Sequence, residues 1–210
     1  MNVTLIGSGN MGSGLAKQLT RAGHHLSILS READKARQLA AQTGAKVADA
    51  AVAGRDAEVI IVATHYEDAV AALRQLGDLT GKTVVDITNP LTADYMGLTI
   101  GHATSAAEEI AKALPCAKVV KAFNTVFAQV LQEGPDFGGG RTVPVFYAGD
   151  DTAAKAQVKE LIASTGFTPV DAGPLKNARY LEPLAGLNIY FGYGAGQGTA
   201  IAPAWIARAQ

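Results

Sequence analysis

The stretch VTLIGSGNMG, residues 3–12, decides the fold of this chain. Its first four residues form an apolar run that predicts a buried strand, and a Gly-x-Gly-x-x-Gly turn follows directly. A stretch with a helical pattern, residues 15–19, comes behind the turn. A strand that leads through such a turn into a helix is typical of the βαβ unit that holds the pyrophosphate of a dinucleotide. We therefore expect a dinucleotide site near the N-terminus.

Each glycine of this turn has its own expected role. Gly7 permits the tight turn, Gly9 leaves room for the backbone to approach the phosphates, and Gly12 lets helix and strand pack closely. The free N–H groups at the start of the helix then face the anion, and the helix dipole favours its negative charge. The predicted pyrophosphate loop consists of Gly7, Ser8, Gly9, Asn10, Met11 and Gly12.

The residues after the second predicted strand, 26–29, indicate which dinucleotide binds. Chains that bind NAD usually place Asp or Glu here, to accept hydrogen bonds from the ribose 2′-hydroxyl. This chain has Ser30 and Arg31 instead, with Lys35 one helical turn further on. A hydroxyl and two cations favour a 2′-phosphate, which a carboxylate would repel. The alternative is that Arg31 and Lys35 form a solvated helix face; the position favours NADP(H) as the cofactor.

The rest of the chain alternates short strands and helices, which predicts right-handed βαβ units. Further strands are expected at residues 45–47, 59–63, 83–87, 118–122, 143–148 and 168–170, and helices at 32–43, 68–76, 105–113 and 151–165. The expected fold is α/β, with a Rossmann-like, doubly wound and mostly parallel sheet. We assign residues 1–176 to the NADP-binding domain. Residues 177–210 form a short helical C-terminal extension that contributes to the substrate cleft and to dimer contacts.

Composition excludes several classes of partner. The net charge of −1 lacks the basic excess of proteins that bind nucleic acid or membrane surfaces. No apolar run reaches transmembrane length, and the N-terminal apolar run is the first strand rather than a signal peptide. The single cysteine, Cys116, excludes an internal disulfide and is typical of a reducing compartment. We expect a cytoplasmic protein without nucleic-acid or membrane partners.

Two side chains are candidates for contact with the reacting ring. His65 is the histidine at the carboxyl end of a predicted strand, and Asn124 follows the strand at 118–122 at a similar height. For His65, we expect either contact with the nicotinamide or the substrate, or a position that faces solvent. For Asn124, we expect either an amide that orients the nicotinamide carboxamide or a turn-forming residue. The sequence shows neither a Ser/His/Asp set nor a Cys/His cluster, so no metal site and no certain catalytic residue are predicted.

Four landmarks resemble the NADPH-dependent reductases of the deazaflavin coenzyme F420 and their bacterial relatives. The same domain occurs in the membrane metalloreductases that reduce ferric iron through a flavin. The resemblance covers essentially the whole chain. The landmarks are the glycine turn, Ser30-Arg31 with Lys35, Lys-Ala-Phe-Asn-Thr at 121–125, and Asp-Ala-Gly-Pro-Leu at 171–175 followed by Asn177 and Arg179.

This resemblance implies a pyrophosphate loop at Ser8–Met11 and a 2′-phosphate site made by Ser30, Arg31 and Lys35. It places five residues near the nicotinamide and its ribose: Ala63, Thr64, His65, Asn124 and Ala128. The family often has Pro-Trp where this chain has His65-Tyr66, and His where Asn124 stands. Both departures lie where the second substrate would bind.

The expected function is NADP(H)-dependent oxidoreduction, with hydride passing between NADPH and a flavin-like or deazaflavin (F420-type) ring. Transfer between two stacked rings needs positioning and exclusion of water, not an obligatory general base. One alternative is an NADPH-dependent imine or hydroxyacid/carbonyl reductase. Another is an NADP(H)-sensing protein without turnover. Aromatic residues gather in the last thirty or so positions, which is more typical of packing or of an interface, and a homodimer is expected.

Overall fold

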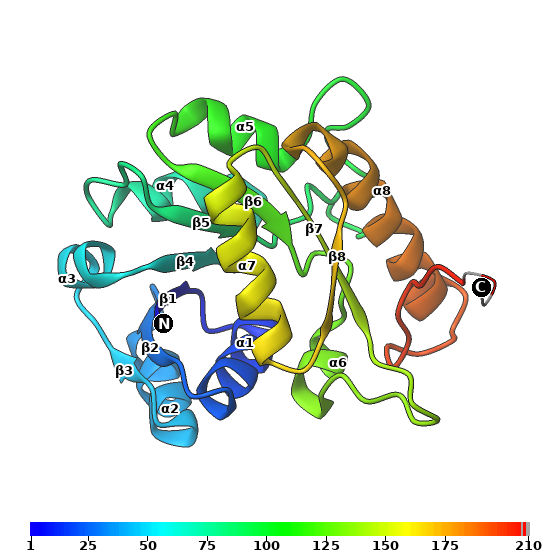
Figure 1. The fold of residues 1–210 in the computed structure, drawn as a ribbon, viewed down its shortest axis with the longest axis horizontal. Coiled ribbons are helices and arrows are strands. Elements are labelled where there is room, and N and C mark those ends of the chain that lie inside the picture. Colours follow the sequence, from blue (N-terminus) through cyan, green and yellow to red (C-terminus); the bar gives the residue numbers. More distant parts are fainter. Residues whose placement is uncertain (207, 209–210) are drawn as a thin grey trace.

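The computed structural model describes residues 1–206 and 208 and contains one eight-stranded sheet with helices on both faces (Figure 1). The strands are β1 (Asn2–Ile6), β2 (His25–Leu29), β3 (Lys46–Val47), β4 (Val59–Val62), β5 (Thr83–Asp86), β6 (Lys118–Ala122), β7 (Pro144–Gly149) and β8 (Thr168–Asp171). They lie in the order β3-β2-β1-β4-β5-β6-β7-β8. Neighbours run parallel except β6 and β7. The expected doubly wound, mostly parallel sheet is confirmed.

Two short helices were not predicted from the sequence. The helices are α1 (Asn10–Arg21), α2 (Ala33–Thr43), α3 (Ala50–Asp56), α4 (Tyr66–Arg74), α5 (Ala106–Ala113), α6 (Ala128–Glu133), α7 (Thr152–Ser164) and α8 (Ala178–Ile189). α3 and α6 were missed because seven and six residues are too few to show a helical period. α4 also begins two residues before the expected start at 68.

The central strands are buried on both faces of the sheet. In β4, Val59 and Ile61 pack in the core beneath α1, α2 and α7, whereas Ile60 and Val62 pack in the core beneath α3, α4 and α5. Successive side chains of a strand point to opposite faces, so a strand covered on both sides must be apolar throughout. This explains the uninterrupted apolar run at residues 59–63.

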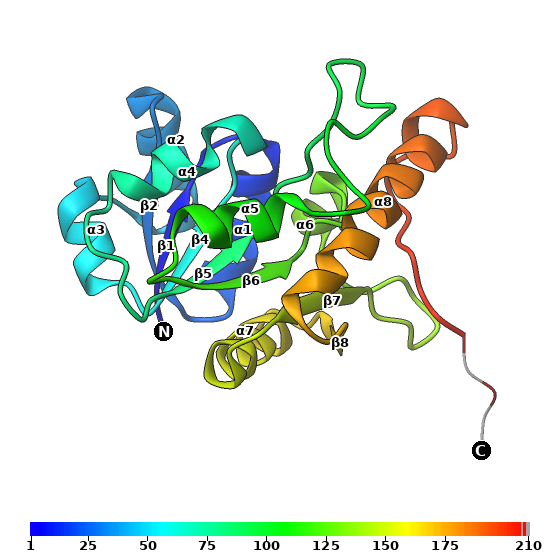
Figure 2. The ribbon, with the colours of Figure 1, turned by 90° about the horizontal axis from the view of Figure 1, so that it is seen from above.

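The C-terminal part folds back along the end of the sheet. A 3₁₀ turn at Leu175–Asn177 leads into α8, which lies beside β7 and carries the chain towards the long loop 88–105 (Figure 2). A π-helical turn, Tyr190–Gly194, follows α8. The expected helical character ends there: residues 195–206 form no helix, and Gly196 and Gly198 have positive φ angles that a helix does not allow. Within residues 1–206 and 208, no helix is long and apolar enough to cross a membrane.

The close packing of α1 on α6 gives a test of the fold. Gly14→Ala should lower the free energy of unfolding by about 1–3 kcal/mol, because a Cβ there would lie 2.5 Å from Leu131 Cβ on α6. The matched control is Gly186→Ala in α8, where an added Cβ meets nothing within 4 Å. That variant should be unchanged or more stable by up to about 1 kcal/mol. Urea unfolding followed by circular dichroism measures both, and equal stabilities would contradict the packing.

Candidate functional site

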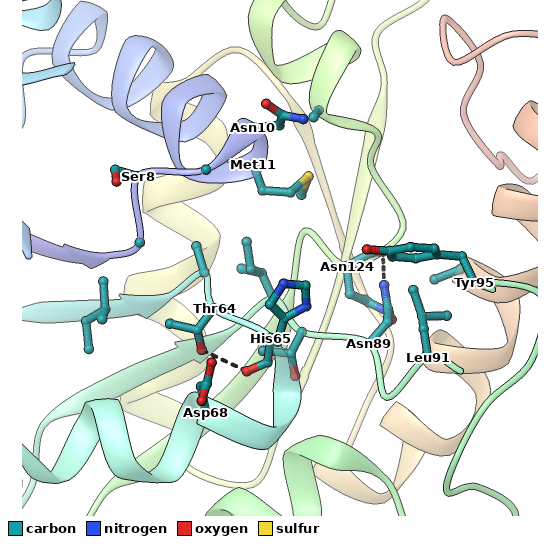
Figure 3. Close-up of a pocket in the computed structure, with 18 of the residues that line it drawn as sticks. Ser8, Asn10, Met11, Thr64, His65, Asp68, Asn89, Leu91, Tyr95 and Asn124 are labelled. Atoms are coloured by element: carbon teal, nitrogen blue, oxygen red, sulfur yellow. Dashed lines mark hydrogen bonds between the residues drawn. The ribbon is translucent and has the colours of Figure 1, made fainter. Parts of the chain in front are cut away.

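A cavity of about 1150 Å³ opens where β1, β4 and β5 end (Figure 3). From β1 the chain runs outward to β2 and β3 and then crosses back to β4 on the other side of β1, so the strand order reverses between β1 and β4. Doubly wound sheets bind their ligands at such switch points. The cavity is larger than the roughly 300–1000 Å³ of an ordinary small-molecule pocket. It therefore offers room for more than one small molecule.

The glycine turn forms one wall of this cavity. Gly7 has a φ of 120°, and a Cβ on it would lie 2.4 Å from the carbonyl oxygen of Ala63. A Cβ on Gly12 would lie 2.2 Å from the carbonyl oxygen of Gly7, so these two glycines hold turn, strand and helix together. Gly9 has nothing within 4 Å of an added Cβ. It keeps the wall clear in front of the α1 N-terminus, which has no side-chain cap and no acidic residue in its first turn.

The predicted 2′-phosphate residues are only partly brought together. Ser30 and Arg31 line the cavity, and the hydroxyl of Ser30 lies 2.7 Å from that of Ser8 in the glycine turn. Arg31 donates to the carboxylate of Asp68 at 2.8 Å. Lys35 does not line the cavity and instead pairs with Glu32 at 2.7 Å. Arg31 is thus the cation that the fold presents at this end.

The residues after β4 form the floor of the cavity. Ala63, Thr64 and His65 all line it, as does Ala128 at the start of α6. His65 precedes α4 in the N-cap position, but its side chain makes no capping hydrogen bond. Figure 3 shows its imidazole pointing from the end of β4 into the space that Met11 faces from the opposite wall. His65 is therefore both exposed and inside the candidate site.

The Asn124 side chain is buried and hydrogen-bonded to neighbouring groups. Its amide nitrogen donates to Oδ1 of Asn89 at 3.0 Å and to the carbonyl oxygen of Leu181 at 2.9 Å. Asn89 in turn donates to the main-chain oxygen of Asn124 at 2.9 Å. Both amide hydrogens of Asn124 are used, so this side chain can meet a ligand only as an acceptor, through Oδ1.

Three buried polar atoms of the described residues lack a hydrogen-bond partner within the protein. They are Oγ1 of Thr88, Oδ1 of Asn124 and Oγ1 of Thr125. All three residues line the cavity, at the adjacent ends of β5 and β6. Buried polar atoms are normally hydrogen-bonded, so two hydroxyls and an amide oxygen without partners, on residues that line the cavity, are available to a polar ligand group. A carboxamide, which both donates and accepts, matches this set.

The side chains of the wall on the far side of the cavity from Arg31 were not predicted individually from the sequence. This wall is built from the loop after β5, the segment before α6, the end of α8 and the π-helical turn that follows α8. Its side chains are Leu91, Tyr95, Met96, Phe127, Ile189 and Tyr193. Tyr193 packs edge-on against Phe127, with ring centroids 5.8 Å apart. The C-terminal aromatic residues were the available signal. Residues 177–210 were expected to contribute to the substrate cleft, but their aromatic side chains were assigned to packing or to an interface because the sequence does not show which of them face the cleft.

A buried ion-pair cluster supports the floor of the site. Lys121 on β6 has no exposed side-chain surface and lies 2.7 Å from the carboxylate of Asp86 and 2.8 Å from that of Glu182. Lys121 also donates to the carbonyl oxygen of Thr88 at 2.6 Å. Glu182 of α8 accepts from the main-chain N–H of Ala106 at 2.9 Å. Burial opposes the ammonium charge, but the two carboxylates outweigh it and raise the pKa of Lys121.

With this geometry described, the chain can be placed among known proteins. The model of the family "NADP oxidoreductase coenzyme F420-dependent" matches residues 2–90. The F420-dependent NADP reductase of Methanothermobacter marburgensis is 31% identical, over 87% of this chain and 88% of the relative. The chain belongs to the F420-dependent NADP oxidoreductase family. The expected resemblance is thereby confirmed.

Two further comparisons extend this result. The metalloreductase STEAP3 of Rattus norvegicus is 35% identical over 87% of this chain, which spans 36% of that relative's length. A crystal structure from Arthrobacter sp. FB24, assigned as an F420-dependent NADP reductase, matches with a TM-score of 0.82 and 31% identity. It covers 95% of this chain and 96% of its own. The complete fold of this chain is therefore found in a relative of the same family.

Because Lys121, Asp86 and Glu182 are buried together, removal of the Lys121 charge should strongly destabilise the fold. Lys121→Met should lower the free energy of unfolding by about 3–5 kcal/mol, because it leaves two carboxylates buried without their cation. The loss should shrink as the pH falls, since a protonated carboxyl is easier to bury. In the wild type the raised pKa means that the ammonium's contribution persists below the ordinary lysine value of 10.5 and disappears only above it.

Guanidinium unfolding at several pH values measures this effect. The control is Lys35→Met, which breaks an exposed pair with Glu32 and should cost at most about 1 kcal/mol. A Lys121→Met loss no larger than that of the control would show that the cluster does not hold the fold together.

Proposed function

We propose that this chain is an NADP(H)-dependent oxidoreductase that passes hydride between NADPH and a flavin-like or deazaflavin ring. One observation carries the proposal: a single cleft joins the glycine turn at one end to an apolar, aromatic wall at the other. The unpartnered polar atoms of Thr88, Asn124 and Thr125 lie at the strand ends between them. The named F420-dependent reductase relatives and the family description support the same reading.

The residues present fit NADP(H) along the length of the cleft. The uncapped start of α1 and the open Gly9 suit the pyrophosphate, since free N–H groups and the helix dipole favour an anion there. Ser30 and Arg31 suit the 2′-phosphate. The two threonine hydroxyls and Oδ1 of Asn124 suit the nicotinamide carboxamide. When bound, NADPH supplies the hydride.

The chain itself contributes alignment and exclusion of water. Leu91 and Ile189 provide apolar surface on the acceptor side, and His65 projects from the floor between the two ends. Ring-to-ring hydride transfer demands that the two rings lie face to face at short distance, and solvent can supply any proton. An aromatic and aliphatic wall opposite the nicotinamide residues serves this purpose.

A carbonyl or imine reductase is the alternative that one observation favours. Such a substrate needs a proton as its hydride arrives, and His65 is an exposed imidazole that faces the cleft. An NADP(H) sensor without turnover is the remaining alternative. The cofactor affinity and the pH profile of turnover distinguish these functions.

Arg31→Ala should weaken NADPH binding by more than tenfold and leave NADH binding unchanged. A charge-assisted contact to phosphate contributes about 1.5–3 kcal/mol, and Asp68 would remain beside the phosphate without its cation. Dissociation constants from the quenching of protein fluorescence measure both cofactors. The control is Arg37→Ala, because Arg37 pairs with Asp34 on α2 and does not line the cavity. Equal losses for NADPH and NADH would mean that Arg31 does not contact the 2′-phosphate.

His65→Ala should lower turnover on the order of tenfold or less, because alignment is shared among several contacts. Steady-state oxidation of NADPH with flavin acceptors should give the same pH profile for variant and wild type. If His65 were a proton donor, its replacement would instead lower turnover by about 10²–10⁴-fold and remove one pKa from the pH profile. That second result, with NADPH affinity intact, would favour a carbonyl or imine substrate. Binding of NADPH without oxidation by any acceptor would favour the sensor.

A further inference from the structure

Tyr95, in the loop after β5, has an unusual backbone conformation. Its φ angle is 62°, in the left-handed region that residues with a bulky side chain rarely adopt. Among the described residues, His102 and Phe123 are the others besides glycine with a positive φ. Phe123 is buried and packs edge-on against Phe167, so core contacts offset its strain. Tyr95 is 52% exposed, and core packing does not account for its conformation.

Hydrogen bonds within the loop hold Tyr95 in this conformation. An antiparallel bridge between Leu91 and Leu98 closes a short segment, which we call the Tyr95 hairpin. Inside it, the N–H of Tyr95 donates to the carbonyl oxygen of Thr92 at 2.8 Å. The N–H of Thr92 donates to the carbonyl oxygen of Gly97 at 2.9 Å, and the N–H of Gly97 donates to Oγ1 of Thr92 at 2.9 Å. These bonds fix the backbone on both sides of the strained residue.

The Tyr95 hairpin presents the Tyr95 ring to the cavity. Tyr95 lines the cavity, and Figure 3 shows its phenol group pointing from the loop towards the interior. The next residue, Met96, lies against the turn after α8, since a Cβ on Gly194 would be 3.6 Å from Sδ of Met96. The hairpin is therefore supported from behind by the C-terminal part of the chain, while the phenol group projects into the cleft.

The Tyr95 ring has no aromatic partner among the described residues. The two other aromatic side chains that line the cavity, Phe127 and Tyr193, pack against each other, whereas Tyr95 belongs to no such pair. Aromatic rings gain free energy by packing against a second ring. Backbone strain also gathers at ligand sites, where the position of a side chain matters more than local stability. An exposed phenol ring on a fixed support is thus suited to a planar ligand.

We propose that Tyr95 contacts the acceptor and stacks its phenol ring against the acceptor's planar ring. The inference rests on the proposed function, because it takes the acceptor to be a flavin-like or deazaflavin ring. Tyr95 belongs to the wall on the far side of the cavity from Arg31, so its contact is with the acceptor rather than with the 2′-phosphate of NADP(H). Because the hairpin already fixes the backbone of Tyr95, little conformational freedom is lost when the acceptor binds.

Two substitutions remove the ring and preserve the backbone. Glycine adopts a positive φ without strain and asparagine tolerates it, so Tyr95→Gly and Tyr95→Asn should melt at the wild-type temperature or above it. Both variants should raise the dissociation constant and KM of riboflavin and 5-deazariboflavin by on the order of three- to tenfold. The dissociation constant of NADPH should stay unchanged. Fluorescence anisotropy of the flavin with NADP⁺ present measures binding, and oxidation of NADPH measures KM.

Two controls separate the ring from the backbone. Tyr95→Phe retains the ring and should keep the wild-type dissociation constants. The matched control for strain is His102→Gly, because His102 has a φ of 57° in the same loop but is exposed and does not line the cavity. Glycine relieves backbone strain there as well, so this variant should bind both ring probes as the wild type does.

The outcomes distinguish this inference from the proposed function. If Tyr95→Gly and Tyr95→Asn bind the ring probes as tightly as the wild type, the inference is overturned and ring reduction stands. A lower melting temperature together with equally weakened NADPH binding also overturns it, because the ring would then only support the loop. A wild type that binds NADPH but oxidises it with neither riboflavin nor 5-deazariboflavin contradicts the proposed function, and the inference with it.

Discussion

The charge on Lys121 is the constraint on which the site depends. It lies at the carboxyl end of the buried sheet and is neutralised by Asp86 from β5 and Glu182 from α8, two elements almost a hundred residues apart in the sequence. A buried pair of this kind adds little net stability over apolar packing, but it tolerates no missing partner. It therefore specifies one arrangement of β5, β6 and α8. Through Thr88 and Ala106 it also holds the loop after β5 and the start of α5.

This arrangement divides the cleft into two parts of different origin. The dinucleotide end is made by short connections at the ends of β1, β2 and β4, whose positions follow from the parallel sheet. The proposed acceptor end is made by the loop after β5, by α8 and by the turn that follows it. The buried cluster and the hydrogen bond from Asn124 to Leu181 both hold α8 in place. Under the proposed function, the first part suits a cofactor shared by many enzymes and the second determines what reacts with it.

The polar groups near the centre of the cleft show how these parts meet. Asn89 and Asn124 hold the ends of β5 and β6 together, and Asn124 also binds the main chain of α8 through Leu181. These contacts use both donors of the Asn124 side chain, while its Oδ1 and the hydroxyls of two threonines that line the cavity have no partner within the protein. To orient a planar amide, a site needs side chains that are held rigidly and that still have free hydrogen-bonding atoms.

The sequence by itself determined the doubly wound sheet, the glycine turn and the family, because strand periodicity, glycine spacing and helix caps are local signals. It placed Arg31, His65 and Asn124 near one edge, since parallel strands end together. Tertiary structure alone decided that Lys35 pairs with Glu32, that the Asn124 donors are occupied, and that Asp94 and Tyr193 line the cleft. These facts depend on contacts between distant segments, and such contacts leave no period or spacing in the chain.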